Sequence, residues 1–256
     1  MGFYNVTEFS YPSQGFTEYR IFSHGVKTGY LREKTNKIDT EFIDEEPEYI
    51  LELKHDRSVR ESAKRSKQTI YQFARANIWE YFVTLTFDRS IVDSSVYDCV
   101  AKYVGTYLHN LRRVAPNLKY LFVPELHSDG IHYHVHGLVA DCSDIAFIDS
   151  GHVDATKNII YNMPSYHGGF STATKVKDVS KVSSYITKYI TKSLTFSLKG
   201  KRRFWASKNL NKPIIKQYNL ETDIVKQSIL SNNVIYVKTV LCPQSGNIIQ
   251  YLQVHD

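Results

Sequence analysis

The sequence predicts an α+β domain in which helices cover an antiparallel sheet. Two kinds of segment support this fold class. Some alternate apolar with polar residues or are rich in β-branched and aromatic residues, as strands are: 81–88, 120–125 and 131–140. Others repeat apolar residues at helical spacing: 57–80, 94–114 and 178–194. Their order along the chain, in which the strands follow one another between helices, is typical of a sheet with helices packed on it.

The helical segments differ in how clear their apolar stripes are. In 57–80 the stripe follows helical spacing roughly and consists of Val59, Ala63, Ile70, Phe73, Ala74 and Ile78. In 94–114 it is continuous and consists of Val96, Val100, Tyr103, Val104, Tyr107, Leu108 and Leu111. Pro116 is expected to end this second helix, and Asp178 or Ser180 to cap the start of the third.

The strand segments include a predicted hairpin. Residues 120–125 and 131–140 flank Asp129-Gly130, a dipeptide typical of tight hairpin turns. Residues 141–170 are expected to be rich in loops. Two further strand candidates, NVIYVKTVL and NIIQYLQV, lie near the end of the chain.

The 256 residues are predicted to form one central domain with two extensions. Residues 1–55 are expected to be an irregular N-terminal extension with short strands. Residues 56–213 would form the domain itself, and residues 214–256 a β-rich C-terminal extension packed on the same domain. No internal repeat interrupts this division.

The composition favours a nucleic acid as partner. The net charge is +6, and residues 54–75 hold seven Lys or Arg against two acidic residues, while KGKRR at 199–203 forms a second basic cluster. A solvated surface would explain each charge run taken alone. Three cysteines without a CxxC pair exclude a zinc ribbon and favour a reducing, cytoplasmic compartment. No apolar run is long enough to span a membrane, and no secretory signal is recognisable.

Three histidines occupy alternate positions of one predicted strand: His132, His134 and His136. Side chains two residues apart on a strand share a face, so two imidazoles can converge on one ion. Glu125, which ends the preceding strand, would face them across the hairpin. Imidazole and carboxylate together suit Mg²⁺ or Mn²⁺ with a phosphate present. The alternative is a solvent-facing polar stripe that happens to be histidine.

The segment YITKYITK, 185–192, predicts a second functional group. Read as a helix it places Tyr185, Tyr189 and Lys192 on one face, with Lys188 beside them. A phenol is a poor nucleophile near neutral pH, but a neighbouring cation can stabilise the charge that develops when it attacks phosphorus. The chain has 19 tyrosines, so such a pair also arises by chance.

FVTLTF (82–87), HVHGL (134–138) and YITKYITK (185–192) together resemble, in order and spacing, the three motifs of the HUH endonucleases. These enzymes start rolling-circle replication, and the resemblance is greatest to phage and plasmid replication initiators of the filamentous-phage type. VPELHSDG, YNMPSYHGGFS and RRFWASKNLNKP also look similar. The resemblance spans residues 75–213. It implies a five-stranded antiparallel sheet of RRM-like, ferredoxin-like layout, in which FVTLTF is a structural central strand.

The resemblance also implies the roles of individual residues. His134, His136 and Glu125 would hold the metal; His132 with His134 is the other possible pair, and His127 is a lesser candidate. Either Tyr185 or Tyr189 would be the nucleophile, with Lys188 and Lys192 as their partners. Further residues are expected to bind DNA, with Trp205 and its neighbour Phe204 stacking on bases: Arg112, Arg113, Lys201, Arg202, Arg203 and Trp205.

The implied activity is metal-dependent nicking of single-stranded or hairpin origin DNA through a 5′-phosphotyrosyl intermediate, followed by strand rejoining. No G-x-x-x-x-G-K-[ST] motif is present, so a host helicase is expected as partner, together with a host DNA polymerase that extends the free 3′-OH. Two alternatives stay open: an HUH transposase or relaxase, and an RRM-like nucleic-acid-binding protein without catalysis.

Overall fold

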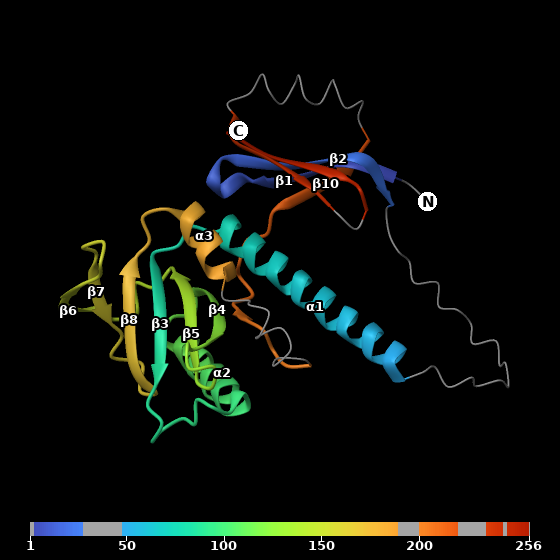
Figure 1. The fold of residues 1–256 in the computed structure, drawn as a ribbon. Helices are drawn as coiled ribbons and strands as arrows, with labels where there is room; N and C mark the ends of the chain where they lie inside the picture. Colours follow the sequence, from blue (N-terminus) through green and yellow to red (C-terminus); the bar gives the residue numbers. More distant parts are fainter. Residues whose placement is uncertain (1–2, 28–47, 189–199, 220–233, 243–244, 256) are drawn as a thin grey trace. The chain divides into compact units, whose positions relative to one another are not determined.

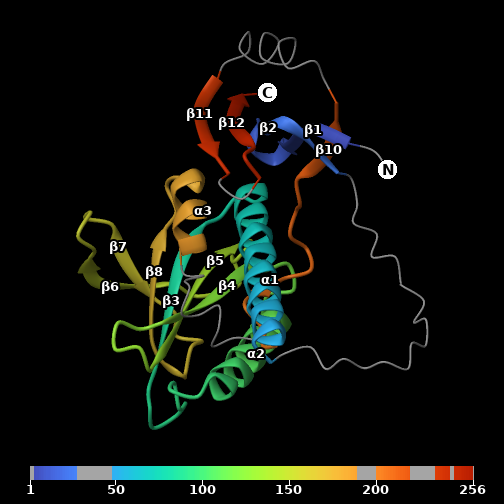
Figure 2. The same ribbon diagram turned by 45° about the vertical axis from the view of Figure 1, so that its right-hand side comes forward.

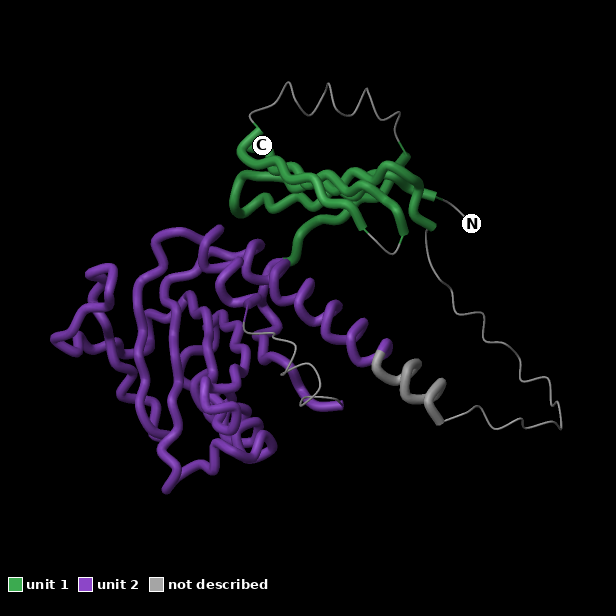
Figure 3. Tube along the Cα trace, in the orientation of Figure 1, with its two compact units in different colours: residues 1–48, 212–256 green, residues 49–211 purple. Residues whose placement is uncertain are grey.

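The computed structural model describes residues 3–27, 48–188, 200–219, 234–242 and 245–255, the side chains of 48–56 excepted. The chain divides into two compact units (Figure 3). One consists of residues 49–211, and the other combines residues 1–48 with 212–256.

The unit of residues 49–211 is built on an antiparallel sheet. Among its described residues the sheet has seven strands in the order β6-β7-β8-β3-β5-β4-β9 (Figure 1). The strands are β3 (Tyr81–Phe87), β4 (Lys119–Leu126), β5 (Tyr133–Ala140), β6 (Ile148–Val153), β7 (Ile159–Asn162), β8 (Gly169–Lys175) and β9 (Trp205–Ala206). Within the sheet, the central strands β3, β5 and β4 carry most of the buried side chains, such as Leu85, Val135 and Phe122.

Helices pack on both faces of this sheet: α1 (Glu48–Ala76), α2 (Tyr97–Val114) and α3 (Val179–Lys188). Strand β3 shows which face each covers, because its side chains alternate. Phe87 contacts Tyr103 of α2, with ring centroids 6.2 Å apart, whereas Phe82 contacts Tyr185 of α3 at 5.5 Å. Helices α2 and α3 therefore lie on opposite faces. The C-terminal end of α1 lies beside α3 in both views (Figures 1 and 2).

The other unit is a sheet made from both ends of the chain. Its described strands are ordered β10-β1-β2-β12-β11. They are β1 (Phe3–Tyr11), β2 (Phe16–Lys27), β10 (Ile214–Tyr218), β11 (Val234–Leu241) and β12 (Ile248–His255), with a short 3-10 helix, η1 (Pro12–Gln14), between β1 and β2. A small core of Val6, Ile21, Leu252 and Val254 holds the sheet together.

The α+β class and the antiparallel pairing agree with the prediction. Helix α2 and the hairpin of β4 and β5 lie where the sequence places them, and so does α3 as far as Lys188, beyond which the predicted helix lies outside the described residues. The sheet of residues 49–211, however, has seven described strands instead of five. Most of 141–170 is loop, as expected, but the prediction missed β6, β7 and the start of β8, which also lie there. Strand β6 is exposed at nearly every position, so its sequence has no apolar alternation to reveal it.

The terminal segments also differ from the expected pair of separate extensions. Strand β1 pairs with β10, and β2 pairs with β12, so residues from opposite ends of the sequence form one sheet. The helix predicted over 57–80 begins earlier and ends at Ala76, which leaves Ile78 exposed. None of the helices in the described residues combines the length and the apolar composition needed to cross a membrane.

Candidate active site

Strand β5 presents His134 and His136 on one face of the sheet, because they are two residues apart. The packing of β5 against Phe122 of β4 explains why a glycine follows the two histidines. Gly137 lies opposite Phe122 of β4, and a Cβ at position 137 would stand 2.2 Å from the Phe122 ring. Only glycine lets this ring fill the space behind the strand, so Gly137 fixes β5 against β4.

His136 has a partner on each side of its ring. Its Nε2 lies 2.6 Å from Oε2 of Glu125, and its Nδ1 lies 3.1 Å from Oγ1 of Thr84. Thr84 stands directly opposite His136 in the pairing of β3 with β5. With Glu125 ionised, Nε2 donates to the carboxylate and Nδ1 accepts from the hydroxyl. The two contacts fix both the tautomer and the orientation of a side chain that is 8% exposed.

His134 lies directly opposite Glu125 in the pairing of β4 with β5, so it shares the face of His136. Its ring stacks on His127 with centroids 4.7 Å apart. Burial lowers the pKa of His134, and the neighbouring His127 and His136 lower it further. His134 is therefore neutral over a wider pH range than a free histidine, and neutral imidazole is the form that binds metal.

His132 lies just before β5 and has a different environment. Its Nδ1 is 2.7 Å from Oδ2 of Asp129, whose other oxygen accepts hydrogen bonds from the backbone N–H groups of Ile131 and His132. These bonds, the one from the His132 backbone most of all, lower the pKa of Asp129 strongly. Asp129 thus ties His132 to the hairpin loop.

His134, His136 and Glu125 suit the expected metal in donor type and in their shared face, since imidazole and carboxylate bind Mg²⁺ or Mn²⁺. Within the ranges that the structure describes, no three His, Cys, Asp or Glu side chains are grouped closely enough to hold an ion. Glu125 and His136 instead bind each other. An ion would replace that hydrogen bond.

Tyr185 lies on α3, on the histidine face of the sheet. Asp178 caps this helix, because its Oδ1 accepts a hydrogen bond from the N–H of Lys181 at 3.0 Å. Ile186 is buried in the core, and this leaves Tyr185 on the adjacent side, 47% exposed. The Nζ of Lys188 is 5.7 Å from the centroid of its ring. Tyr189 and Lys192 lie outside the described residues.

Phe82 links the tyrosine to the histidines. Its ring centroid lies 5.5 Å from that of Tyr185 and 5.8 Å from that of His136. A phenol from α3 and an imidazole from β5 therefore lie against the same ring of β3, and Glu125 of β4 contacts that imidazole. Strand pairing brings the imidazole and the carboxylate together, and the packing of α3 on the sheet adds the phenol.

Residues 80–194 match the family model of replication-associated protein ORF2/G2P. The matched segment contains Glu125, the histidines and Tyr185, and it excludes both terminal segments of the chain. The match supports a role in DNA replication. No curated protein and no solved structure matches the chain.

The residues predicted to bind DNA are spread over several environments: Arg112 and Arg113 lie within the segment that matches ORF2/G2P, and Lys201, Arg202, Arg203 and Trp205 follow it. Trp205 is 3% exposed and pairs with Phe122 through β9, so its indole is part of the core and is not placed to stack on bases. Arg203 is also buried, and its Nη1 donates to Oγ of Ser62 at 2.6 Å. Lys201 forms an ion pair with Asp98 at 3.0 Å. These contacts are structural and stabilise the unit of residues 49–211.

The other three predicted cations differ in their exposure. Arg202 and Arg113 are exposed, and Arg112 is half-buried with its Nη2 3.4 Å from the carbonyl oxygen of Pro116. The backbone carbonyl of Arg202 accepts a hydrogen bond from the hydroxyl of Tyr97. Arg202 and Arg113 are therefore the members of the set whose guanidinium groups are free to meet a phosphate from solution.

Sequence reasoning missed Thr84 and Phe82, which it assigned to a purely structural strand. Both contact site residues, and the alternation within FVTLTF is the signal that could have found them. Phe82 and Thr84 are two positions apart, and the register of β3 with β5 sets them opposite Leu138 and His136. The face that carries the histidines therefore also carries the even-numbered residues of β3.

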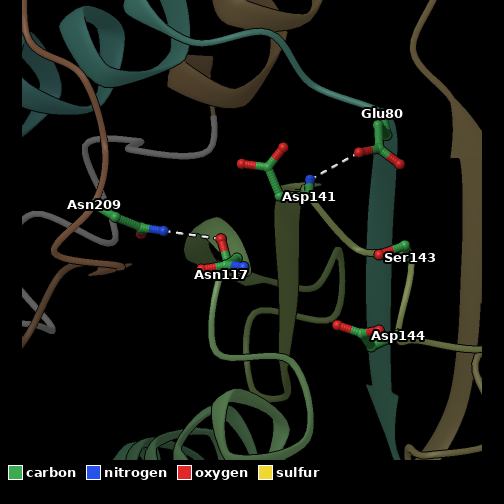
Figure 4. Close-up of a pocket in the computed structure, with 6 residues that line it drawn as sticks. All are labelled: Glu80, Asn117, Asp141, Ser143, Asp144 and Asn209. Carbon is green, nitrogen blue, oxygen red and sulfur yellow. Dashed lines mark hydrogen bonds between the residues drawn. The ribbon is translucent and has the colours of Figure 1, made fainter.

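A pocket of about 520 Å³ lies at the other end of β5, away from these groups (Figure 4). It is lined by Glu80, Asn117, Asp141, Ser143, Asp144 and Asn209. The carboxylate of Glu80 accepts a hydrogen bond from the N–H of Asp141 at 2.7 Å, and Asn209 donates to the carbonyl of Asn117 at 2.9 Å. None of the predicted site residues lines it.

Proposed function

We propose that this chain is a rolling-circle replication initiator with the fold and chemistry of the HUH endonucleases. It would nick single-stranded or hairpin origin DNA through a tyrosine, with Mg²⁺ or Mn²⁺ as cofactor, and later rejoin the strand. The match to replication-associated protein ORF2/G2P supports the replication role. The nicking chemistry rests on the arrangement of Tyr185, His136 and Glu125.

The observation that carries the proposal is the shared contact with Phe82. Tyr185 and His136 both lie against this ring, at 5.5 and 5.8 Å between centroids. A phosphate bound at the histidines would thus have the phenol of Tyr185, on α3, within reach. The side chain of Tyr185 is 47% exposed, and attack on a DNA backbone requires such exposure.

In the proposed reaction the oxygen of Tyr185 gives up its proton and attacks the scissile phosphorus. The bond from phosphorus to the 3′ oxygen breaks, and that oxygen leaves as a free 3′-OH after taking up a proton. The product is a 5′-phosphotyrosyl enzyme. Lys188, one turn along α3, would stabilise the negative charge that develops at the phenol and the phosphate.

His134, His136 and Glu125 would hold the divalent metal, which supplies positive charge to the phosphate when it is bound. Thr84 keeps His136 oriented through the hydrogen bond to Nδ1. The low pKa of His134 keeps its imidazole neutral and able to bind metal. We prefer the pair His134–His136 over His132–His134, because His134 and His136 both lie on β5 and His136 contacts Glu125, whereas His132 precedes the strand and contacts Asp129.

The intermediate conserves the energy of the broken bond. A later 3′-OH can attack the phosphotyrosine, release Tyr185 and close the strand without ATP. Tyr189 with Lys192 would serve as a second nucleophile while Tyr185 is occupied. A host polymerase would extend the free 3′-OH, and a host helicase would separate the strands, because the chain has no nucleotide-binding loop of its own.

Adduct formation tests the proposal. Single-stranded DNA from the replicon that encodes the chain is incubated with the protein and Mn²⁺ or Mg²⁺, and covalent adducts are detected on denaturing gels. We expect an adduct that chelation of the metal prevents. Tyr185→Phe should abolish or strongly reduce it, and Tyr236→Phe, an equally exposed tyrosine on β11, should not.

The Tyr185→Phe, Tyr189→Phe double variant decides the assignment. If it still forms the adduct at the wild-type rate, the proposed nucleophiles are wrong. If the wild-type protein binds the DNA and leaves it intact under all metal conditions, the chain is a binding module without catalysis.

A further inference from the structure

Phe170 is a large aromatic side chain that the described part of the fold leaves more than half exposed. It lies on β8, where it is 58% exposed. It belongs to YNMPSYHGGFS, the segment that resembles the replication initiators but has no role in the chemistry proposed above. Exposing one aromatic ring costs free energy that burial would recover, so its contact with a ligand would be favourable.

The strand register places Phe170 on the histidine face of the sheet. Phe170 pairs with Thr86, and Thr172 with Thr84 in the pairing of β3 with β8. Thr84 in turn pairs with His136. Directly paired residues project to the same side, so Phe170, both threonines of β3 and His136 lie on one surface.

The same register gives the position of Phe170 along that surface. Leu85 is the last residue of β3 that pairs with β5, with Val135 as its partner, and Thr86 and His134 are the next residues of the two strands. Continuing this register, we place Phe170, Thr86 and His134 in one row across β8, β3 and β5, which are neighbours in the sheet (Figure 1). Two strand spacings separate the ends of the row, or about 10 Å between backbones.

The backbone around Phe170 is held in place. Gly169 has φ of +145°, and a Cβ there would stand 2.4 Å from the backbone N of Asp88 and 2.4 Å from the carbonyl oxygen of Thr86. Position 169 therefore accepts glycine alone, which lets the start of β8 approach β3 closely. Phe170 is presented by this fixed strand, so little conformational entropy is lost when a ligand contacts the ring.

We propose that Phe170 is a stacking platform for an unpaired base of the DNA strand that passes the histidines. This inference rests on the proposed function, because it takes that strand as the substrate. The face around Phe170 also carries the hydroxyls of Thr86 and Thr172, which can bind phosphate and sugar. One exposed ring among hydroxyls fits a nucleic acid better than an apolar protein surface. Stacking would determine which nucleotide next to the scissile phosphate is held with its base unpaired.

The test separates contacts to bases from contacts to phosphates. Binding of a thymine homopolymer and of an abasic chain with the same number of phosphates is measured for the wild type and for Phe170→Ala. We expect Phe170→Ala to weaken homopolymer binding about 10-fold, within the range measured for base–aromatic stacking. Binding of the abasic chain and the dependence of affinity on salt should not change.

Two further variants complete the experiment. Phe170→Trp should keep the wild-type affinity, and its added fluorescence should be quenched by the homopolymer but not by the abasic chain. Val153→Ala, which alters an equally exposed side chain on β6, should bind both ligands as the wild type does. Thermal unfolding of each variant shows that it is folded.

The result that overturns the platform is an equal loss of affinity for both ligands in Phe170→Ala, or no loss for either. Adduct formation, measured in parallel, distinguishes this failure from failure of the proposed function. If the wild type forms adducts and Phe170→Ala binds the homopolymer as the wild type does, the stacking role of Phe170 is wrong and the nicking activity is supported. If binding depends on Phe170 but no adduct forms, the nicking activity is wrong and the stacking role is supported.

Discussion

Gly137 illustrates how one residue fixes the histidine pair. A methyl group at this position would overlap the ring of Phe122 at 2.2 Å, and both residues lie in the core of the sheet. We expect Gly137→Ala to lower the free energy of unfolding by about 1–3 kcal/mol, the usual cost of overpacking. Urea denaturation followed by circular dichroism measures the change.

Gly105 is the matched control for that substitution. It lies inside α2, and no atom of the fold stands within 4 Å of the position its Cβ would take. Gly105→Ala should therefore stabilise the protein by up to about 1 kcal/mol, because alanine favours the helix. Equal effects at both positions would show that helix and strand propensity, and not the contact with Phe122, decides the outcome. Phe122→Leu should partly rescue Gly137→Ala.

Thr84 tests whether the orientation of His136 matters for the chemistry. Thr84→Val removes the hydroxyl 3.1 Å from Nδ1 and keeps the shape of the side chain. Groups that orient a metal ligand typically contribute about 10- to 100-fold, so the rate of adduct formation should fall about 10-fold and more metal should be needed to restore it. Thr174→Val, on the same face of β8, should keep the wild-type metal dependence. Unchanged kinetics in Thr84→Val would make this contact structural.

The hairpin of β6 and β7 is an element whose stability depends on pH. Oδ1 of Asp154 accepts hydrogen bonds from the N–H groups of Thr156 and Asn158, at 2.8 and 2.9 Å, and Oδ2 accepts one from the Asn158 side chain at 3.0 Å. These bonds, the one from the Asn158 side chain first, lower the pKa of Asp154 from 3.8 to about 2. Because the ionised carboxylate accepts these bonds best, it stabilises the folded turn above pH 3.8. This stabilisation is lost as the pH falls towards about 2 and the carboxyl takes up a proton.

Hydrogen exchange at the Thr156 and Asn158 amides measures this effect. Asp154→Asn keeps the size of the side chain but cannot ionise, so these amides should exchange faster than in the wild type near neutral pH. The difference should shrink below about pH 4 and fall to about half near pH 2, where about half of the wild-type carboxyls are neutral. A difference that stays constant over this range would assign the effect to geometry alone.

Elements with strong periodic patterns are the ones that the sequence predicts well. Helix α2 and strands β3, β4 and β5 have long apolar stripes or clear alternation, and the hairpin between β4 and β5 sets Glu125 opposite His134 as expected. Strands β6 and β7 could not be found, since exposed strands lose the alternation that burial imposes. The role of Trp205 was misjudged because an aromatic residue beside basic residues looks the same in sequence whether it faces solvent or the core.

At the scale of the whole molecule, the pairing of the two chain ends could not be predicted from local sequence patterns. Val6 pairs with Tyr218, and nothing within either strand identifies a partner so far along the chain. The match to the ORF2/G2P family covers neither of these residues. The segment that matches this family and the terminal sheet are therefore separate in the sequence, and they can be tested for separate folding.

The two hydrophobic cores predict that the two units can fold separately. The larger core runs from Ile70 to Leu210 and lies wholly within residues 49–211, while the smaller core draws on both chain ends. A fragment of residues 49–211 therefore contains every buried side chain of its own core, so we expect it to fold alone and to form the DNA adduct. Circular dichroism with a cooperative thermal transition tests its folding, and the adduct assay tests its activity. A folded fragment without activity would show that the terminal sheet takes part in DNA binding, and an unfolded fragment would show that the larger core depends on the terminal strands.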